Sequence, residues 1–229
     1  MITVIIPAMN EEKTIGNVVR YCFSQSGVSE VIVIDDNSED RTIAEAKKAG
    51  ADIISSCQQG KGMSMKEGIE HARNEILVFL DADIDPYPKN TIASLVTPLL
   101  TDDADFVKAG FSRNAGRVTE LVAKPLLSLL YPELATFEQP LSGMIAGKKS
   151  LFEKVEFFYD YGVDIGILID MFQMNARIEE VHIGYIQNKS KPWSGLVKMS
   201  QEVTRAILHK AGVNKIQEMP SLLPVSTTH

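Results

Sequence analysis

Cysteine is scarce in this sequence, and no run of apolar residues reaches the length of a membrane span. The 229 residues include two cysteines, Cys22 and Cys57, which do not form a Cys-x-x-Cys pair. This usage favours two buried thiols in a reducing cytosol. The amino-terminal stretch MITVIIPAMN lacks the basic segment and the cleavage site of a signal peptide. We therefore expect a cytoplasmic protein without a membrane span.

An excess of basic residues is also missing. Lysine and arginine number 23 against 30 aspartates and glutamates, which gives a formal net charge of −7. Sequence-independent binding of nucleic acid needs a basic face, so we expect no nucleic-acid partner, and the attraction of an anionic ligand must be local. The hydrophobic and charged fractions, 45% and 23%, are typical of a globular domain. We predict one domain over residues 1–215 and a loose tail over 216–229.

The first hundred residues alternate short apolar runs with helical patterns. The apolar runs predict strands over 2–7, 30–36, 51–56 and 75–85, and the helical patterns cover 14–25, 38–50 and 60–73. This alternation is typical of βαβ units, and continuous apolar runs favour a sheet that is covered on both faces. The second half adds predicted strands at 105–111 and 178–186, and helices from 116 and from 196 to about 211. We predict an α/β fold with a mostly parallel sheet flanked by helices, in which the second half forms a lobe of its own.

Polar residues follow three of the predicted strands. After the first strand comes PAMNEE, after the second DDNSED, and the fourth ends in DADID. Ligands of open α/β sheets bind at the carboxyl ends of the strands, where these segments would meet. Asp81 and Asp83 lie on one side of an extended chain, and clustered carboxylates suit Mg²⁺ or Mn²⁺, which would also bridge a diphosphate. Taken singly, each segment also fits a helix N-cap or a solvated turn, and their convergence favours a ligand site.

Two further segments contain cations that could meet an anion. Lys61 lies between two glycines, but the GxxxxGK[ST] spacing of a phosphate-binding loop is absent. The sequence Gly-Lys-Gly is also typical of a simple turn. If it lies beside a metal–diphosphate site, Lys61 would contact a phosphate or the base. The stretch GRVTELVAKPLL predicts a helix that opens with Arg117, although a helix start already attracts anions through its free backbone N–H groups. An arginine on a solvated face, with Glu120 as its partner, is the alternative.

Seven segments of the chain resemble a known family. The stretches IPAMNEEKTIGNVV, IDDNSEDRT, GKGMSMKEG and VFLDADI, in this order, are similar to GT-A glycosyltransferases that use nucleotide sugars. The stretches GRVTELVAKPLL, QPLSGMIAGKKSLFE and YGVDIGILID resemble glucosyl-3-phosphoglycerate synthases, which are retaining enzymes similar to GT81 members. The resemblance runs from about residue 3 to residue 200. It implies a GT-A fold with a nucleotide-sugar half over 1–110 and an acceptor half over 111–215.

The resemblance also implies an activity and the residues that carry it. Glucose would pass from UDP-glucose to D-3-phosphoglycerate, with Mg²⁺ or Mn²⁺ as the cofactor. Whether the protein forms a homodimer stays open. The nucleotide sugar would be bound by Pro7, Ala8, Met9, Glu11, Asp36, Ser38, Lys61, Asp81, Ala82, Gly143, Tyr161 and Asp164. Catalysis would involve Asp83, Lys61 and Asp164. The metal would be held by Asp83, together with Asn188 at the position of a family histidine. The acceptor would be bound by Gly116, Arg117, Thr119 and Ser190. The forked guanidinium of Arg117 suits a phosphate.

One segment departs from this family. Where its members have a His-Arg-Asn sequence, a gapless comparison through Gly184 and Pro192 places Asn188, Lys189 and Ser190. Asn188 offers Mg²⁺ a carbonyl oxygen, which binds it more weakly than an imidazole would bind a softer ion. Ser190 offers the glycerate one hydrogen bond. The acceptor and the metal affinity therefore stay open.

The mechanism that the resemblance implies is hexosyl transfer with retention at the anomeric carbon. Lys61 and the metal would stabilise the departing nucleoside diphosphate. No carboxylate stands out as a covalent nucleophile, so we expect front-side attack in which the leaving phosphate takes the proton of the acceptor.

Other functions stay open on the sequence. A GT-A transferase could use GDP-mannose or a lipid-phosphate acceptor, although the chain lacks a membrane segment for the latter. A nucleotidyltransferase would begin with a glycine-rich basic loop, which PAMNEE is not. A haloacid-type phosphatase would carry an aspartate motif similar to VFLDADID after its first strand rather than its fourth. A non-catalytic domain would bind the sugar nucleotide without turnover.

Overall fold

The computed structural model describes residues 1–112, 116–187 and 192–213. Its strands are β1 (Ile2–Ala8), β2 (Val28–Asp35), β3 (Asp52–Ser55), β4 (Ile76–Phe79), β5 (Phe106–Ser112), β6 (Ile145–Lys148) and β7 (Ile178–Tyr185). Its α-helices are α1 (Ile15–Phe23), α2 (Thr42–Lys48), α3 (Lys61–His71), α4 (Thr91–Leu100), α5 (Lys124–Leu130), α6 (Lys149–Phe152), α7 (Val163–Gln173) and α8 (Trp193–Lys210). A π-helix, η1 (Thr119–Ala123), and a 3-10 helix, η2 (Pro132–Thr136), lie between β5 and β6. The strands and helices predicted for the first hundred residues are present, although β4 ends earlier than predicted.

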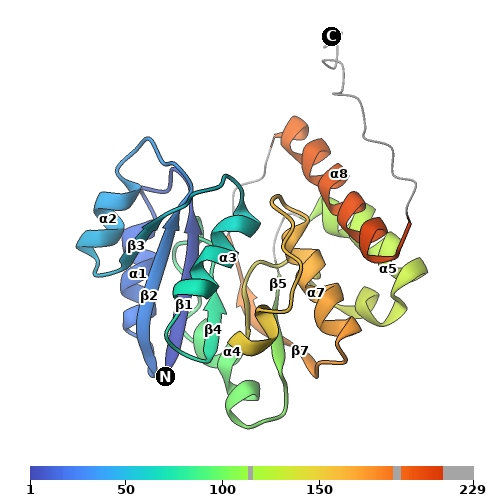
Figure 1. Ribbon diagram of the computed structural model, residues 1–229, viewed down its shortest axis with the longest axis horizontal. Helices are drawn as coiled ribbons and strands as arrows, with labels where there is room; N and C mark the ends of the chain where they lie inside the picture. The colour runs from blue at the N-terminus through green and yellow to red at the C-terminus, as the bar shows by residue number, and fades with distance from the viewer. Residues whose placement is uncertain (113–115, 188–191, 214–229) are drawn as a thin grey trace.

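One seven-stranded sheet runs through the molecule in the order β3-β2-β1-β4-β6-β5-β7. β1 pairs in parallel with β2 and β4, and β2 pairs in parallel with β3. β5 and β7 are parallel to each other, whereas β6 is antiparallel to both β4 and β5. In Figure 1, β1 rises from the amino terminus at the bottom, so the carboxyl ends of the parallel strands point upward. Because β6 runs the other way, the residues that precede it arrive at this same edge.

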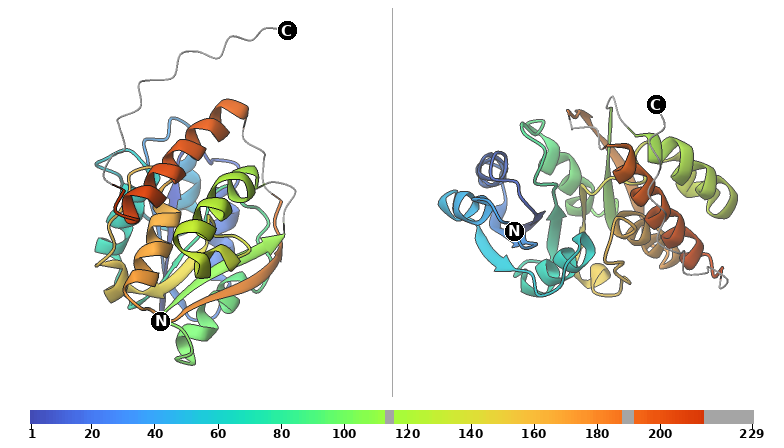
Figure 2. Two further views of the ribbon diagram at one scale, coloured as in Figure 1. Left: turned by 90° about the vertical axis from the view of Figure 1, so that its right-hand side faces the viewer. Right: turned by 90° about the horizontal axis from the view of Figure 1, so that it is seen from above.

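Helices cover both faces of the sheet, as the continuous apolar strands predict. Val4 and Ile6 of β1 pack into a core that α1 and α4 share. Ile5 points to the opposite face and packs into a core with α3, α7 and α8. The view from above in Figure 2 shows these helices on the two sides of the sheet. Successive residues of one strand are thus buried on opposite faces, which is why the strand sequences are apolar almost throughout.

The helix predicted from residue 116 departs from regular α geometry. Arg117 and Val118 are helical, the π-helix η1 follows, and α5 begins at Lys124. Inside an α-helix, Pro125 would lack a backbone donor and its ring would clash with the carbonyl four residues earlier. The wider π turn lies directly before it, so the proline stands at the start of α5 rather than within a regular helix.

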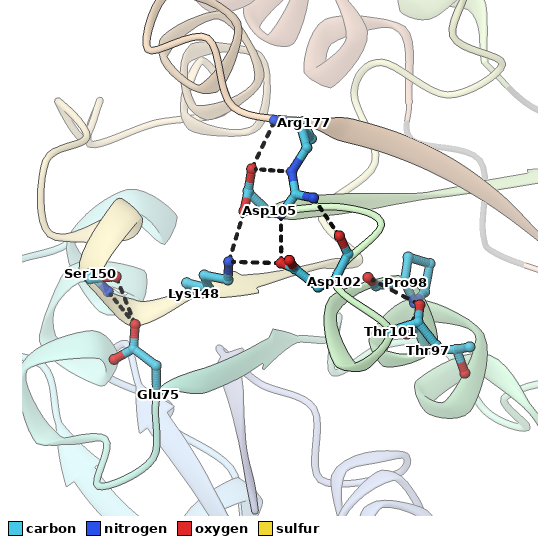
Figure 3. A network of polar contacts seen from close by, with 9 residues as sticks. All are labelled: Glu75, Thr97, Pro98, Thr101, Asp102, Asp105, Lys148, Ser150 and Arg177. Atoms are coloured by element: carbon cyan, nitrogen blue, oxygen red, sulfur yellow. Dashed lines mark hydrogen bonds and ion pairs between the residues drawn. The ribbon is translucent and has the colours of Figure 1, made fainter.

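A network of charged side chains joins the strands of the second half at the amino ends of β5 and β7 (Figure 3). Asp105, which precedes β5, accepts hydrogen bonds from Arg177 and Lys148. Arg177 also contacts Asp102, at 2.7 Å. The hydrogen bonds from Arg177 and then from Lys148 hold the pKa of Asp105 well below its usual range. The network ties the start of β5 to both of its neighbours in the sheet.

The two cysteines differ in exposure. Cys22 is buried in α1, whereas Cys57 is exposed, so the prediction of two buried thiols is wrong for Cys57. Cys57 lies in the loop between β3 and α3, among the polar residues of SSCQQG, which offer no apolar surface to cover the thiol. The composition of the whole chain therefore did not predict the surroundings of this residue.

Within the described ranges, no helix combines the length and the apolar run that crossing a membrane requires. The tail predicted over 216–229 lies outside the described residues. The domain limits at 110 and 215 stay predictions.

Candidate active site

The polar segments that follow β1, β2 and β4 meet at the carboxyl edge of the sheet, as predicted. They line a cavity of about 610 Å³ together with the start of α3, the residues before β6 and the start of α7. Of the predicted site residues, the cavity is lined by Pro7, Ala8, Met9, Glu11, Asp36, Lys61, Asp81, Ala82, Asp83, Gly143, Tyr161 and Asp164. Its volume is in the range of small-molecule sites. The structure brings these residues together, and their individual roles stay predictions.

Lys61 lies between two carboxylates in this cavity. It is the first residue of α3, and its Nζ atom is 3.1 Å from Asp81 Oδ1 and 2.9 Å from Asp164 Oδ2. Burial opposes the charge of Lys61, but attraction to Asp164 and Asp81 outweighs it and holds the pKa of Lys61 above its usual range. The Tyr87 hydroxyl donates to the Asp81 carbonyl at 2.8 Å and fixes the backbone there. A charged ammonium is therefore held at the edge of the sheet where the predicted metal and diphosphate would bind.

Asp164 offers a hydrogen-bond acceptor that no described residue uses. It is the second residue of α7, after Gly162 at the N-cap position, and its side chain is 4% exposed. Oδ2 accepts the hydrogen bond from Lys61, whereas Oδ1 is buried and has no hydrogen-bond partner in the described part of the chain. A buried carboxylate oxygen without a donor is costly, so a ligand hydroxyl at this position would be stabilising.

The glycines near Lys61 occupy positions where neighbouring atoms leave no room for a side chain. A Cβ atom on Gly143 would lie 2.3 Å from Lys61 Nζ and 2.7 Å from Asp81 Oδ1. At the two glycines that flank Lys61, the close neighbours are backbone atoms instead of side chains. A Cβ atom on either would lie 2.0 Å or 1.7 Å from a carbonyl oxygen of residues 158–159. The flanking glycines thus let the loop before α7 pack against the start of α3, whereas Gly143 leaves room for the charged side chains.

Asp36 connects the end of β1 to the start of α3. Its backbone N–H donates to the Ala8 carbonyl at 2.9 Å, and its Oδ2 accepts from the Gly60 N–H at 3.0 Å. Its Oδ1 is buried without a partner among the described residues. Ser38 does not line the cavity; its hydroxyl accepts from the Asn10 N–H at 2.9 Å and joins the loops that follow β1 and β2.

The carboxylates of Asp81 and Asp83 suit a hard divalent cation. Among the residues that the structure describes, no three His, Cys, Asp or Glu side chains form a group that could hold a metal by themselves. Mg²⁺ keeps several waters and is usually held by one or two carboxylates together with substrate phosphates, which fits this donor set. The second predicted ligand, Asn188, lies outside the described residues.

Three of the predicted acceptor residues, Gly116, Arg117 and Thr119, do not line the cavity but follow a strand that does. Phe111 of β5 lines it, and the chain continues to Gly116, whose φ of 129° is in the region that favours glycine. Arg117 is exposed, and Thr119 is buried in η1. η1 contacts α8, which lines the cavity as well. Ser190 lies outside the described residues.

The charge of Arg117 is not paired within the part of the chain that the structure describes. Glu120, its alternative partner, instead contacts Lys124, with 2.6 Å between Oε1 and Nζ. Across the described ranges, Arg117 makes no ion pair. This placement leaves the guanidinium for an anion, and its contact with a phosphate stays a prediction.

One wall of the cavity comes from α8, which carries no motif that the sequence analysis could identify. Lys198, Met199 and Glu202 line the cavity from this helix. Burial raises the pKa of Glu202, whose carboxylate accepts from the Tyr161 N–H at 3.4 Å. The spacing of α8 predicts an apolar face, but only its packing against α7 and α5 decides which polar residues reach the cavity.

Lys108 is another residue that the sequence analysis did not select. It lies in β5, is fully buried, and donates from Nζ to the Ser142 carbonyl at 2.7 Å. Lysine is rarely buried completely, so a lysine within the apolar run DFVKAGF was the available signal.

The fold and the cavity together define a class of protein. Acidic residues and a lysine meet at the carboxyl edge of an open, mostly parallel sheet, which is where α/β proteins of this kind bind their ligands. The family model for glycosyl transferase family 2 matches residues 3–158. The chain belongs to this family.

Along nearly its whole length, the chain is similar to glucosyl-3-phosphoglycerate synthases. That of Mycolicibacterium smegmatis is 36% identical over an alignment of 238 positions, which spans 93% of this chain and 78% of the relative. That of Petrotoga mobilis is 35% identical, covering 91% and 73%. The crystal structure of the Mycobacterium tuberculosis enzyme in complex with phosphoglyceric acid matches with a TM-score of 0.88 at 36% identity, covering 93% of this chain and 80% of that one. The same enzyme in complex with Mn²⁺, UDP-glucose and phosphoglyceric acid matches with a TM-score of 0.87. The predicted GT-A fold is confirmed.

Proposed function

We propose that this protein is a metal-dependent hexosyltransferase that moves glucose from UDP-glucose to D-3-phosphoglycerate. The observation that carries the proposal is the match to the Mycobacterium tuberculosis enzyme bound to Mn²⁺, UDP-glucose and phosphoglyceric acid, which covers 93% of this chain. The cavity supports it, because Lys61 is held between Asp81 and Asp164 where a diphosphate and a sugar would meet.

The donor is proposed to extend across the carboxyl edge of the sheet. Its nucleoside would lie against Pro7, Ala8, Met9 and Glu11 after β1 and Asp36 after β2, all of which line the cavity. Oδ1 of Asp36, which has no partner among the described residues, would accept a hydrogen bond from the base or the ribose. The glucose would lie beside Gly143 and Tyr161, with a hydroxyl donating to Asp164 Oδ1.

The glucosyl group is transferred with retention in this proposal. The bond between the anomeric carbon and the diphosphate oxygen breaks, and the C2 hydroxyl of the glycerate forms its bond on the same face. The proton of that hydroxyl passes to the departing diphosphate oxygen. Lys61 stabilises the negative charge that develops there, and Asp164 orients the sugar. Bound at Asp83, a divalent cation would supply further positive charge to the diphosphate.

The acceptor phosphate is proposed to bind at the helix start formed by Gly116, Arg117 and Thr119. Support comes from the exposed guanidinium of Arg117, which has no partner within the described fold, and from backbone N–H groups at the first turn. Ser190 stays a proposed contact to the glycerate.

A product screen by mass spectrometry tests the proposal. Purified protein and Mg²⁺ are incubated with UDP-glucose or GDP-mannose, each with and without D-3-phosphoglycerate. We expect a hexosyl-phosphoglycerate product with UDP-glucose, and no glycosyl adduct on Asp164. Binding of UDP-glucose without any turnover would contradict the proposed enzymatic activity and support a non-catalytic binding domain. Release of UDP without this product would show that D-3-phosphoglycerate is not the acceptor.

Arg117→Ala tests the phosphate site. Losing a charge-assisted hydrogen bond should raise the KM for D-3-phosphoglycerate about 10- to 100-fold, with little change in the KM for UDP-glucose. Arg20→Ala, on the exposed side of α1, is the matched control and should leave both values unchanged. An unchanged KM for D-3-phosphoglycerate in Arg117→Ala would remove this residue from the acceptor site.

A cytoplasmic location and the absence of a nucleic-acid partner stay predictions from the sequence, and the oligomeric state stays open.

A further inference from the structure

A buried lysine beneath the cavity has no part in the reaction proposed above. Lys108 lies in β5 and is 0% exposed. Its Nζ atom donates to the Ser142 carbonyl at 2.7 Å and reaches the Asp164 carbonyl at 3.4 Å. Among the described residues, no carboxylate lies within ion-pair distance of it. Burying an ammonium without a carboxylate partner is costly, and a methionine of similar length would avoid that cost.

The two carbonyls belong to the two segments that surround Lys61. Ser142 precedes Gly143, which leaves the room that Lys61 Nζ and Asp81 Oδ1 occupy. Asp164 carries the carboxylate that holds Lys61 at 2.9 Å. These segments are distant in sequence, and the Lys108 ammonium connects both of them to β5. It is therefore placed to set their separation.

The charges near Lys108 come from four different elements. Asp164 on α7, Glu180 on β7 and Asp81 after β4 favour its charged form, whereas Lys61 on α3 opposes it. Burial has the largest effect and lowers the pKa of Lys108 to about 8. Lys108 is thus charged at neutral pH and loses its proton in mildly alkaline solution.

We propose that Lys108 is a positioning residue: its charged ammonium holds the Ser142 and Asp164 carbonyls together and thereby places Asp164 and Lys61 against the glucosyl diphosphate. The inference rests on the proposed function and adds to it a residue that does not touch the substrate. Without the charge, the segment before β6 and the first turn of α7 move apart. The sugar end of the donor is then held less well, whereas the nucleoside contacts after β1 and β2 remain.

Lys108→Met tests the inference, because it removes the charge and keeps the length of the side chain. Lys210→Met is the matched control: Lys210 is 5% exposed, and its partners Asp170 and Glu156 lie away from the cavity lining. Steady-state rates are measured with Mg²⁺, UDP-glucose and D-3-phosphoglycerate across neutral and alkaline pH, and thermal unfolding confirms that each variant is folded.

We expect Lys108→Met to lower kcat/KM for UDP-glucose by about 10- to 100-fold, with the KM for D-3-phosphoglycerate nearly unchanged. The wild-type activity should decline above about pH 8, and the variant should lack this alkaline limb. Lys210→Met should lower the Tm and change neither property. The inference is overturned by a folded Lys108→Met with wild-type kinetics, or by the same kinetic changes in Lys210→Met.

If Lys108→Met does not fold, the wild-type protein supplies the test. Calorimetry compares the Kd values of UDP-glucose and of UDP, with Mg²⁺, at pH 7 and pH 9. About one ammonium in ten stays charged one unit above its pKa, so UDP-glucose should bind up to about tenfold more weakly at pH 9, while UDP changes little. Equal changes for both ligands overturn the inference. A protein that binds neither ligand at pH 7 refutes the proposed function instead.

Discussion

A methyl group added at Gly143 should disable the transferase and leave it folded. Its carbon would lie 2.3 Å from Lys61 Nζ and 2.7 Å from Asp81 Oδ1, whereas relaxed contacts need about 3.5 Å. Lys61 must therefore move by roughly 1 Å, and a misplacement of that size costs about 100-fold in rate. Both contacted atoms end side chains rather than belong to the backbone, so we expect Gly143→Ala to lower the free energy of unfolding by no more than about 1 kcal/mol.

Steady-state kinetics with UDP-glucose and D-3-phosphoglycerate measure this effect, and thermal unfolding measures the stability. Gly16→Ala in α1 is the matched control, because a Cβ there would meet its nearest atoms at 3.5 Å. Alanine should stabilise that helix by up to about 1 kcal/mol and leave the activity unchanged. A folded Gly143→Ala with wild-type kcat/KM would refute the reasoning that Lys61 and Asp81 must keep their positions.

Two further predictions concern stability and thiol chemistry. Asp105→Asn weakens the contacts with Arg177 and Lys148, so the free energy of unfolding at pH 7 should fall by about 1–3 kcal/mol. The pKa of Asp105 is lower in the folded than in the unfolded protein, so Asp105 stabilises the fold above about pH 4 and this stabilisation is lost at lower pH. Denaturant unfolding at several pH values should therefore show a smaller loss of unfolding free energy on acidification in the variant than in the wild type. An equal loss in both proteins would contradict this. Burial raises the pKa of the Cys22 thiol to about 12, whereas Cys57 is exposed. Dithiobis-nitrobenzoate should therefore label one thiol per native wild-type chain and none in Cys57→Ser. Rapid labelling of two thiols in the native wild type would contradict this.

Much of the fold was predictable because its signals are local. The apolar runs of β1 and β2 and the helical spacing of α1 each depend on neighbouring residues, and the structure confirms them. β6 was not predictable in the same way. Its four residues, IAGK, include a glycine, and its antiparallel place between β4 and β5 depends on strands distant in the chain.

The candidate site was predictable where it follows strands. Parallel strands bring their carboxyl ends to one edge, so the polar segments after β1, β2 and β4 had to meet once the sheet formed. Which loop residues face the cavity was less predictable. Ser38 was expected to contact the nucleoside, but its hydroxyl joins two loops and does not line the cavity. Lys198 and Glu202 were missed because they reach the cavity through the packing of α8.

By itself, the sequence determined the α/β class, the strand ends that carry the acidic residues, and the resemblance to nucleotide-sugar transferases. These follow from periodicity and from contiguous motifs. Only the tertiary structure decided that Lys61 lies between Asp81 and Asp164, which is 103 residues away along the chain, and that Lys108 is buried below them. The physical reason is that these contacts arise between segments whose separation is set by the packing of helices on both faces of the sheet, which no local preference specifies.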